Sequence, residues 1–421
     1  MKRRLLIALG LFTAALLISW GTASIDRCGT WTATPPALTH LARGQGNLQV
    51  GAAKRPLQPV FPTTVGGYGP LRSTVDSALS PLFARALVLD VGGQRLGVVV
   101  LDVLLIPPQL RDAIGQGQAF PTWVIATHTH SGPSGFDPRF ASELAALGTY
   151  ATADFQVLVD AGRQALTTAT AAVKPVRVEV GQQLFEGVST PRSGSAVDRR
   201  ITRVRFDDEA GPVAQLIIAA AHPTLVARKP EGLHPDWPGL LAERLEREQG
   251  PITLVLQGAG GNASIDRALL PTPEAAATRL EAIVRALPTA AQPAQIDAAW
   301  SEVHLGLPRP DARRVVPGPF VAAAENALCD DAEDIAVLHA LRLGEARFLL
   351  VPFEASYAAG LVLEEQSDAT RLISLADGYG GYVETVEAAR AGDGEARRQY
   401  FPPELLTKLA EAARLAGQSI R

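Results

Sequence analysis

The chain has 421 residues, of which 47% are apolar and 19% are charged, so it can bury one large core or two modest ones without help from disulfides. Its formal net charge of -4 lacks the basic excess that nucleic-acid binding requires, and nucleic acid is therefore not expected as a partner. These properties are typical of a globular enzyme.

Residues 1–24 follow the plan of a secretory signal peptide. Lys2, Arg3 and Arg4 precede an apolar run over residues 5–18, and small residues follow that run. The alternative is an uncleaved N-terminal membrane anchor, although the run is short for a span of about 20 residues. Either interpretation places the body of the protein outside the cytoplasm, as an exported protein that is periplasmic, secreted or membrane-anchored. The two cysteines, at positions 28 and 329, either form one bridge or remain as free or intermolecular thiols.

Beyond a Gly/Pro-rich stretch that reaches about residue 70, apolar strand-like runs alternate with Ala/Leu-rich helical ones. This alternation predicts an α/β or α+β fold, in which mixed β-sheets are layered with helices. The predicted strands cover residues 86–90, 95–102, 122–127, 176–180, 201–206, 215–221, 254–257 and 341–351, and the predicted helices cover residues 140–172, 239–249 and 403–418.

The most informative motif is Ala126-Thr-His-Thr-His-Ser-Gly-Pro133, which follows an apolar run at residues 123–125. On a strand, side chains two positions apart face the same side, so His128 and His130 would present both imidazoles to one pocket. Neutral imidazole is a common zinc ligand, and a catalytic zinc keeps one position open. The alternative is a pair of hydrogen-bonded structural histidines, which the concentration of two of the seven histidines in this octet disfavours.

Further candidate ligands follow other strand-like runs. His222 ends one such run, and taken alone it fits a packed or capping residue as well as a ligand. His234 competes with it, and Asp236 is placed to orient the His234 ring. Glu354 is either a metal ligand or a solvated loop residue, and a nearby Gly-rich segment, residues 377–385, contains two tyrosines.

A glycine-rich turn, Gln257-Gly-Ala-Gly-Gly-Asn-Ala-Ser264, follows the predicted strand over residues 254–257. Such a turn lets the backbone approach a ligand closely and can direct amide N–H groups at an oxyanion, with Ser264 exposed at its end. An ordinary turn after a strand explains the same residues. The spacing matches neither the phosphate-binding Walker pattern nor the dinucleotide fingerprint.

Taken in order, these segments resemble the neutral/alkaline, non-lysosomal ceramidases from about residue 51 to about residue 400. Residues 126–133 look like the family's zinc-binding His-Thr-His-Ser-Gly-Pro motif, and weaker matches lie at residues 191–193, 222, 261–264, 351–354 and 382. The resemblance implies a single catalytic domain over residues 45–421, without the family's C-terminal β-sandwich domain. Two motifs depart from the family pattern: Gly261-Asn-Ala-Ser264 replaces Gly-Asp-Val-Ser, and Pro352-Phe-Glu354 replaces Pro-Gly-Glu.

The resemblance also implies roles for individual residues. Family members hydrolyse the amide between a fatty acyl chain and a sphingoid base, so the implied partner is a lipid-like N-acyl amide, met at a membrane surface. The implied ligands of a zinc ion (Zn2+) are His128, His222, Glu354 and Tyr400. The groups implied to act on the substrate amide are His130, Arg192 and Tyr382, which hold and polarise it, and Ser264, the family's active-site serine.

We therefore expect zinc-dependent amide hydrolysis, in which zinc polarises the amide oxygen and activates water. The sequence leaves open whether water or Ser264 attacks first. One alternative is a zinc hydrolase of another amide or ester, such as an N-acyl amino acid or a lactone, and another is a non-catalytic exported lipid- or metal-binding homologue. The metallo-β-lactamase plan does not fit, because Gly132 and Pro133 stand where that plan continues with Asp and His.

Overall fold

The computed structural model describes residues 2–23, 33–69, 73–139, 142–193, 196–314, 316, 318–331 and 334–421, whose strands form two mixed sheets and three short pairs. The nine-stranded sheet has the order β19 (Arg371–Ile373), β17 (Ala346–Leu350), β16 (Ile335–Leu343), β15 (Gln295–Gly306), β1 (Ala37–Pro56), β4 (Phe83–Val91), β5 (Gln94–Leu101) and β6 (Thr122–Ala126), and β7 (Lys174–Pro175) pairs with β1. The five-stranded sheet has the order β12 (Ile252–Gln257), β11 (Pro212–Ala219), β10 (Arg200–Asp207), β8 (Arg177–Leu184) and β14 (Ala290–Ala291). The short pairs are β2 (Thr63–Thr64) with β3 (Thr74–Val75), β9 (Ser189–Pro191) with β13 (Ala263–Ile265), and β18 (Glu354–Ala355) with β20 (Tyr382–Val383).

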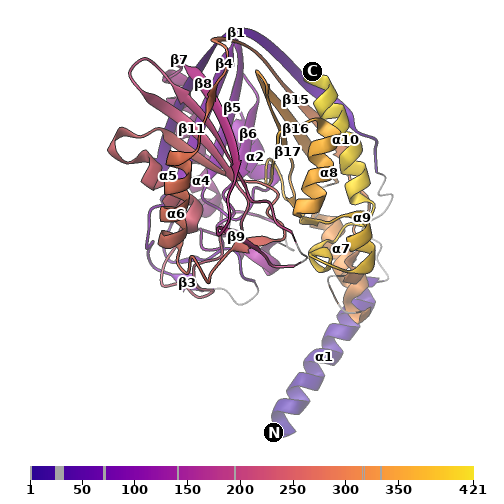
Figure 1. The fold of residues 1–421 in the computed structure, drawn as a ribbon. Coiled ribbons are helices and arrows are strands. Elements are labelled where there is room, and N and C mark those ends of the chain that lie inside the picture. Colours follow the sequence, from indigo (N-terminus) through magenta and orange to yellow (C-terminus); the bar gives the residue numbers. More distant parts are fainter. Residues whose placement is uncertain are drawn as a thin grey trace.

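The α-helices pack on the outer faces of these sheets or extend from them (Figure 1). They are α1 (Lys2–Ala23), α2 (Pro108–Gly115), α4 (Thr152–Ala171), α5 (Asp236–Glu246), α6 (Pro273–Ala286), α7 (Val321–Asp331), α8 (Tyr357–Ser367), α9 (Val386–Ala391) and α10 (Leu405–Ser419).

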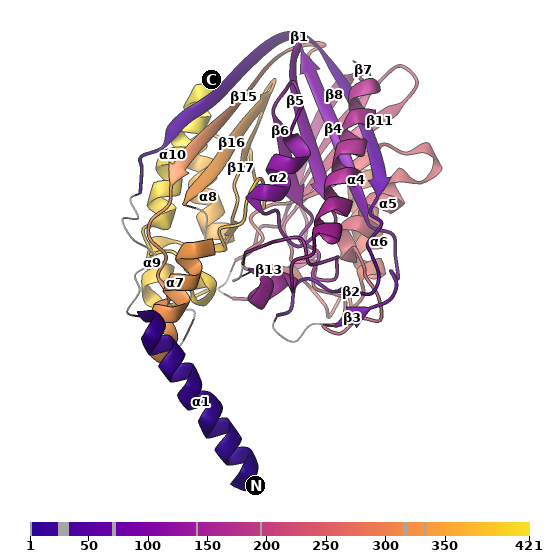
Figure 2. The same ribbon diagram turned by 180° about the vertical axis from the view of Figure 1, so that it is seen from behind.

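The long strand β1 joins the two halves of the larger sheet. Its residues 37–47 pair with β15, and its residues 48–56 pair with β4. In Figures 1 and 2 it arches over the top of the molecule from one half to the other. No strand was predicted here because the stretch is rich in glycine. These glycines allow neighbouring main-chain atoms to approach β1 closely. A Cβ on Gly44 would lie 2.1 Å from the Val91 carbonyl oxygen, and a Cβ on Gly51 would lie 2.0 Å from that of Ala169 on α4.

The layers of the fold follow from four apolar cores. Large side chains such as Trp123, Phe206 and Trp300 fill the space between the two sheets, where each contributes about 1.5–3 kcal/mol or more. Helices α2 and α4 cover the β4–β6 half of the larger sheet, α8 and α10 cover the β15–β17 half, and α5 and α6 cover the outer face of the smaller sheet. The predicted fold class, mixed sheets layered with helices, is confirmed.

Two predicted elements are wrong. The helix expected over residues 140–172 is interrupted, because Gly148, at a φ of 69°, separates a short π-helix (Glu143–Leu147) from α4. The strand expected over residues 341–351 is part of the β16–β17 hairpin, because Gly344, at a φ of 59°, turns the chain back. Both errors come from apolar runs that continue across a glycine.

The N-terminal helix α1 packs against α7 and against the short 3-10 helix before it (Gly318–Phe320), where the Phe12 ring lies edge-on to the Phe320 ring at a centroid distance of 6.5 Å. Among the residues that the structure describes, no helix has the length and apolar character needed to cross a membrane. Cys28 lies outside the described residues, and Cys329 on α7 is disulfide-bonded. The signal-peptide assignment stays a prediction.

A buried ion-pair cluster ties the two sheets together. The Arg85 side chain on β4 is 2% exposed, and its guanidinium lies 2.9 Å from Glu246 Oε1 on α5 and 3.1 Å from Asp102 Oδ2. The same Asp102 oxygen accepts from the Phe83 amide at 2.9 Å. Asp102 immediately precedes Val103, whose carbonyl accepts from the His128 amide, so this cluster supports the segment that carries His128.

Replacing Arg85 by methionine should lower the free energy of unfolding by about 3–5 kcal/mol, because the buried Asp102 carboxylate would lose its cation. The matched control is Arg95→Met, since Arg95 is 42% exposed in its pair with Asp90 and should contribute about 0–1 kcal/mol. Urea denaturation followed by tryptophan fluorescence measures both. Equal losses for the two variants would contradict a structural role for the Arg85 cluster.

Candidate functional site

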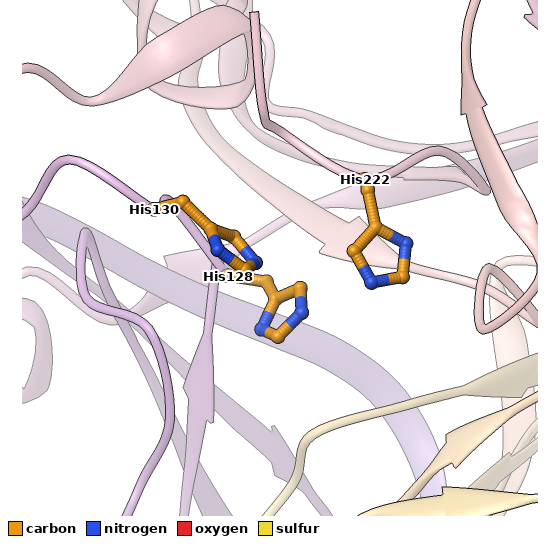
Figure 3. A group of neighbouring side chains, drawn as sticks. All are labelled: His128, His130 and His222. Carbon is orange, nitrogen blue, oxygen red and sulfur yellow. The ribbon is translucent and has the colours of Figure 1, made fainter. Parts of the chain in front are cut away.

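Three histidines from two sheets converge where strands end. His128 and His130 follow β6 in the larger sheet, and His222 follows β11 in the smaller one. Strand β6 is parallel to β5, and β11 is parallel to β12. Open α/β sheets place their ligand sites outside the carboxyl ends of such strands. In Figure 3 the three imidazole rings face one common space.

The turn after β6 differs from the predicted strand geometry. The strand ends two residues before His128, so the expectation that His128 and His130 lie on a strand is wrong. Beyond the strand, the amides of Thr127 and His128 donate to the carbonyls of Leu101 and Val103, at 3.0 Å each. His128 takes a φ of 69°, a strained conformation for a residue other than glycine. The two rings still share one space, with centroids 4.9 Å apart.

The main chain also fixes which nitrogen of each ring faces the common space. In all three histidines, Nδ1 lies against a main-chain carbonyl oxygen. A carbonyl can only accept, so Nδ1 carries the proton and Nε2 presents its lone pair. One ligand atom from each ring lies within 4.8 Å of the others, so this group can hold a metal ion. The contacts are His128 to Leu104 at 2.7 Å, His130 to Gly67 at 3.2 Å, and His222 to Gly260 and Ala263 at 3.0 Å each.

Glu354, the first residue of β18, brings a buried carboxylate to the same space. Its Oε2 lies 2.7 Å from His222 Nε2 and 3.2 Å from His128 Nε2, and its Oε1 accepts from the Tyr379 hydroxyl at 2.6 Å. Burial alone would raise the pKa of Glu354, but His128 and His222 hold that pKa well below its ordinary value. The carboxylate is therefore ionised when a positive charge lies beside these ring nitrogens.

These contacts need a positive charge between the carboxylate and the ring nitrogens, because lone pairs and a carboxylate oxygen repel one another at such distances. Burial lowers the pKa of His222, and burial together with the neighbouring histidines lowers the pKa of His130 well below its ordinary value. Protonation of His222 and of His130 is thus disfavoured. The donor set therefore fits a metal ion better than it fits a shared proton.

Tyr382 and Arg192 lie at the edge of this group. The Tyr382 hydroxyl lies 3.0 Å from His222 Nε2 and accepts from Arg192 Nη2 at 3.1 Å. Arg192 also donates to the Gly261 carbonyl at 2.7 Å and lies 3.3 Å from Glu395. Burial and the charge of Glu354 raise the pKa of Tyr382 well above its ordinary value, so the phenol can donate a proton in a hydrogen bond at neutral pH.

Tyr400, expected as a metal ligand, is partly buried and packs against Gly381, where a Cβ would lie 2.5 Å from its Cε1. Two other tyrosines contact the candidate metal ligands: Tyr379 donates to Glu354, and Tyr382 contacts His222. The ligand role of Tyr400 stays a prediction. Sequence reasoning gave no role to Tyr379, whose only signal was its place in a Gly-rich segment.

The glycine-rich turn after β12 packs against Glu354 instead of facing an oxyanion. A Cβ on Gly261 would lie 2.6 Å from the Glu354 carbonyl oxygen, so only glycine allows this approach. The expectation that the amides of this turn face an oxyanion is wrong for those that donate to main-chain carbonyls: Gly258, Gly260, Gly261 and Ala263.

Ser264 lies on β13 and lines a cavity of about 590 Å³, whose lining also includes His130, Arg192 and Tyr382. The structure thus brings together the four residues that were expected to act on the substrate amide. The competing histidine, His234, lies outside the metal-holding group.

Comparison with known proteins relates the chain to one family. Residues 50–253 match the model of the neutral/alkaline non-lysosomal ceramidase N-terminal domain. A neutral ceramidase of Mycobacterium tuberculosis (strain ATCC 25618 / H37Rv) is 29% identical over 144 residues, which cover 31% of this chain and 22% of that protein. The match therefore spans about a fifth of the length of that relative.

Two solved structures share the fold. Neutral ceramidase from Pseudomonas aeruginosa aligns with a TM-score of 0.74 at 18% identity, over 88% of this chain and 74% of that one. A ceramidase complexed with C2 aligns with a TM-score of 0.73 at 18% identity, over 88% of this chain and 75% of that one.

The hydroxyl of Tyr379 should strengthen metal binding by orienting the Glu354 carboxylate. A Tyr379→Phe variant keeps the ring but removes the hydrogen bond to the carboxylate, and we expect metal affinity to fall by about 10–100-fold. Tyr150→Phe is the matched control, because Tyr150 packs against Phe155 away from the three histidines. Competition with a chelator measures both affinities, and an unchanged affinity in Tyr379→Phe would refute the orienting role.

Proposed function

We propose that this chain, whose residues 50–253 match the model of the neutral/alkaline non-lysosomal ceramidase N-terminal domain, belongs to that family and is a zinc-dependent hydrolase of N-acyl amides with ceramide as the expected substrate. One observation carries the proposal. Two imidazole Nε2 atoms and the Glu354 carboxylate meet in a buried space, at 2.7 Å and 3.2 Å, beside a cavity lined by Ser264.

Zinc suits this donor set better than a hard cation does. Zinc accepts imidazole nitrogen together with carboxylate oxygen, whereas magnesium and calcium are bound mainly by oxygen. His128, His222 and Glu354 would hold the ion. Two tyrosines are candidates for a further oxygen ligand. Tyr382 is a candidate because it contacts His222, and Tyr400 because the family resemblance implies it.

Amide hydrolysis needs a polarised carbonyl, a nucleophile and a proton for the leaving nitrogen. When bound, zinc supplies Lewis acidity and lowers the pKa of a water ligand to about 7. Arg192 and Tyr382 are the donors on the cavity side that can stabilise negative charge on the amide oxygen.

His130 is suited to proton transfer. Its Nδ1 faces the Gly67 carbonyl, and its buried Nε2 has no hydrogen-bond partner among the residues that the structure describes. A neutral His130 can therefore take a proton from the nucleophile at Nε2 and return it to the leaving nitrogen. Ser264 lies in the same cavity, where its hydroxyl can position the acyl group or accept it.

We also propose that the protein acts outside the cytoplasm, as one catalytic domain over residues 45–421. The basic and then apolar pattern of residues 2–18 supports export. The sharing of β1 by both halves of the larger sheet supports a single domain.

Metal removal tests the proposed activity. Purified protein should release fatty acid from ceramide, lose that activity after chelation, and regain it with zinc but not with magnesium. His222→Ala should be inactive and bind less zinc, whereas His304→Ala, in an ion pair with Glu302 outside the histidine group, should behave as the unmodified protein. Turnover that survives chelation would refute zinc dependence, and an absence of turnover on every N-acyl amide tried would refute the proposed function.

The role of Ser264 has its own test. We expect Ser264→Ala to lower kcat by about 100-fold or more while zinc stays bound. Ser189→Ala is the matched control, since Ser189 lies opposite Ile265 on the paired strand and donates to the Ala220 carbonyl. Near-full turnover by Ser264→Ala would show that the serine takes no part in the reaction.

A further inference from the structure

The cavity in front of the histidines has an unusual charge. Four arginines line it, and none of its described lining residues is acidic. They come from separate segments of the chain: Arg192 after β9, Arg228 from the loop after β11, Arg267 from the segment after β13, and Arg398 from the segment before α10.

Two of these arginines are compensated inside the protein. Glu395 is 2% exposed and lies 3.3 Å from Arg192, and it also forms an ion pair with Arg398. Both guanidinium groups lie over the Tyr382 ring, at 5.7 Å and 5.8 Å from its centroid. Arg192 and Arg398 therefore share one carboxylate.

The other two have no carboxylate partner among the residues that the structure describes. Arg228 is exposed and lies 5.3 Å above the Tyr68 ring, and Arg267 is exposed and donates to the Thr224 carbonyl. The nearby carboxylate of Asp236 is buried and accepts from the amides of Leu225, Val226 and Trp237. The mouth of the cavity thus carries a net positive charge.

The charge of Arg228 lies close to the reacting groups. The Tyr68 ring is 5.1 Å from the His130 ring, and Arg228 lies over that same tyrosine. A Cβ on Gly67 would lie 2.7 Å from His130 Cα, so the Tyr68 segment is packed tightly against this histidine. The Tyr68 ring thus lies between Arg228 and His130. At this short separation, Arg228 can reach a small charged group on the substrate that is attached near the scissile amide.

Guanidinium groups recognise carboxylate and phosphate through paired hydrogen bonds, and a positive cavity raises the local concentration of anions. A neutral amide has no anionic group that could form these paired hydrogen bonds or be attracted by the positive charge. We propose that the site prefers acidic N-acyl amides to neutral ones such as ceramide, because Arg228 and Arg267 bind a carboxylate or phosphate on the amine portion. This inference rests on the proposed amide hydrolysis and names the class of amine that the site accepts.

Matched substrate pairs test it. N-palmitoylglycine is compared with N-palmitoylglycinamide, and ceramide 1-phosphate with ceramide, by palmitate release. We expect kcat/KM to be about tenfold or more higher for the acidic member of at least one pair, and which pair responds distinguishes a carboxylate from a phosphate. Equal rates within both pairs would overturn the inference while leaving amide hydrolysis intact.

Arginine variants locate the effect. Arg228→Gln and Arg267→Gln together should raise KM for the acidic substrate about tenfold and leave the neutral substrate unchanged. Arg414→Gln is the matched control, an exposed arginine on α10. A preference for acidic substrates that survives the double substitution would assign it to other residues and overturn the proposal.

A binding measurement separates this inference from the proposed function. Chelator-treated protein cannot turn over by a zinc-dependent route, so calorimetry with N-palmitoylglycine and N-palmitoylglycinamide reports recognition alone. Tighter binding of the acid that weakens with salt and in the double variant supports the inference even if no substrate is cleaved. Equal binding of the two ligands would overturn it even if ceramide is cleaved.

Discussion

The contact of Glu354 with His222 and His128 is the constraint on which the site depends. A buried, ionised carboxylate that lies 2.7 Å and 3.2 Å from imidazole nitrogens is unfavourable unless a cation joins them. His128 follows β6, His222 follows β11 and Glu354 begins β18, and these strands belong to three different sheets. Their meeting therefore requires the larger sheet to keep both halves in place, which β1 does by pairing with β15 and β4.

Backbone groups, more than side chains, orient these ligands. The carbonyls of Leu104, Gly260 and Ala263 fix the rings of His128 and His222, and a carbonyl has fewer ways to move than a long polar side chain. This explains the glycines of the turn after β12. They allow the main chain to pass close to β18, and the carbonyls of that turn then face His222.

Much of the site was predictable because its residues lie in short motifs at strand ends. His128, His130, His222 and Glu354 follow apolar runs, Ser264 ends a glycine-rich turn, and the structure brings these side chains to one region. The contact of Tyr379 with Glu354 was not predictable, because it depends on pairing between β18 and β20, which are short and distant in sequence. Strand β1 was also missed because its glycines are explained by contacts with distant residues. They lie against Val91 and α4, where a side chain would not fit.

In the proposed site, the groups assigned to the reaction and the groups assigned to substrate choice lie on different segments. The buried histidines closely follow β6 and β11, and Glu354 begins β18, whereas Arg228 and Arg267 lie in exposed segments farther from the ends of β11 and β13. Loops tolerate substitution better than strand ends that carry ligands. A change in the charge of the cavity mouth can therefore alter which amide is accepted without disturbing the metal-holding group. The family resemblance thus supports the proposed bond that is cleaved more strongly than the identity of the amine that is released.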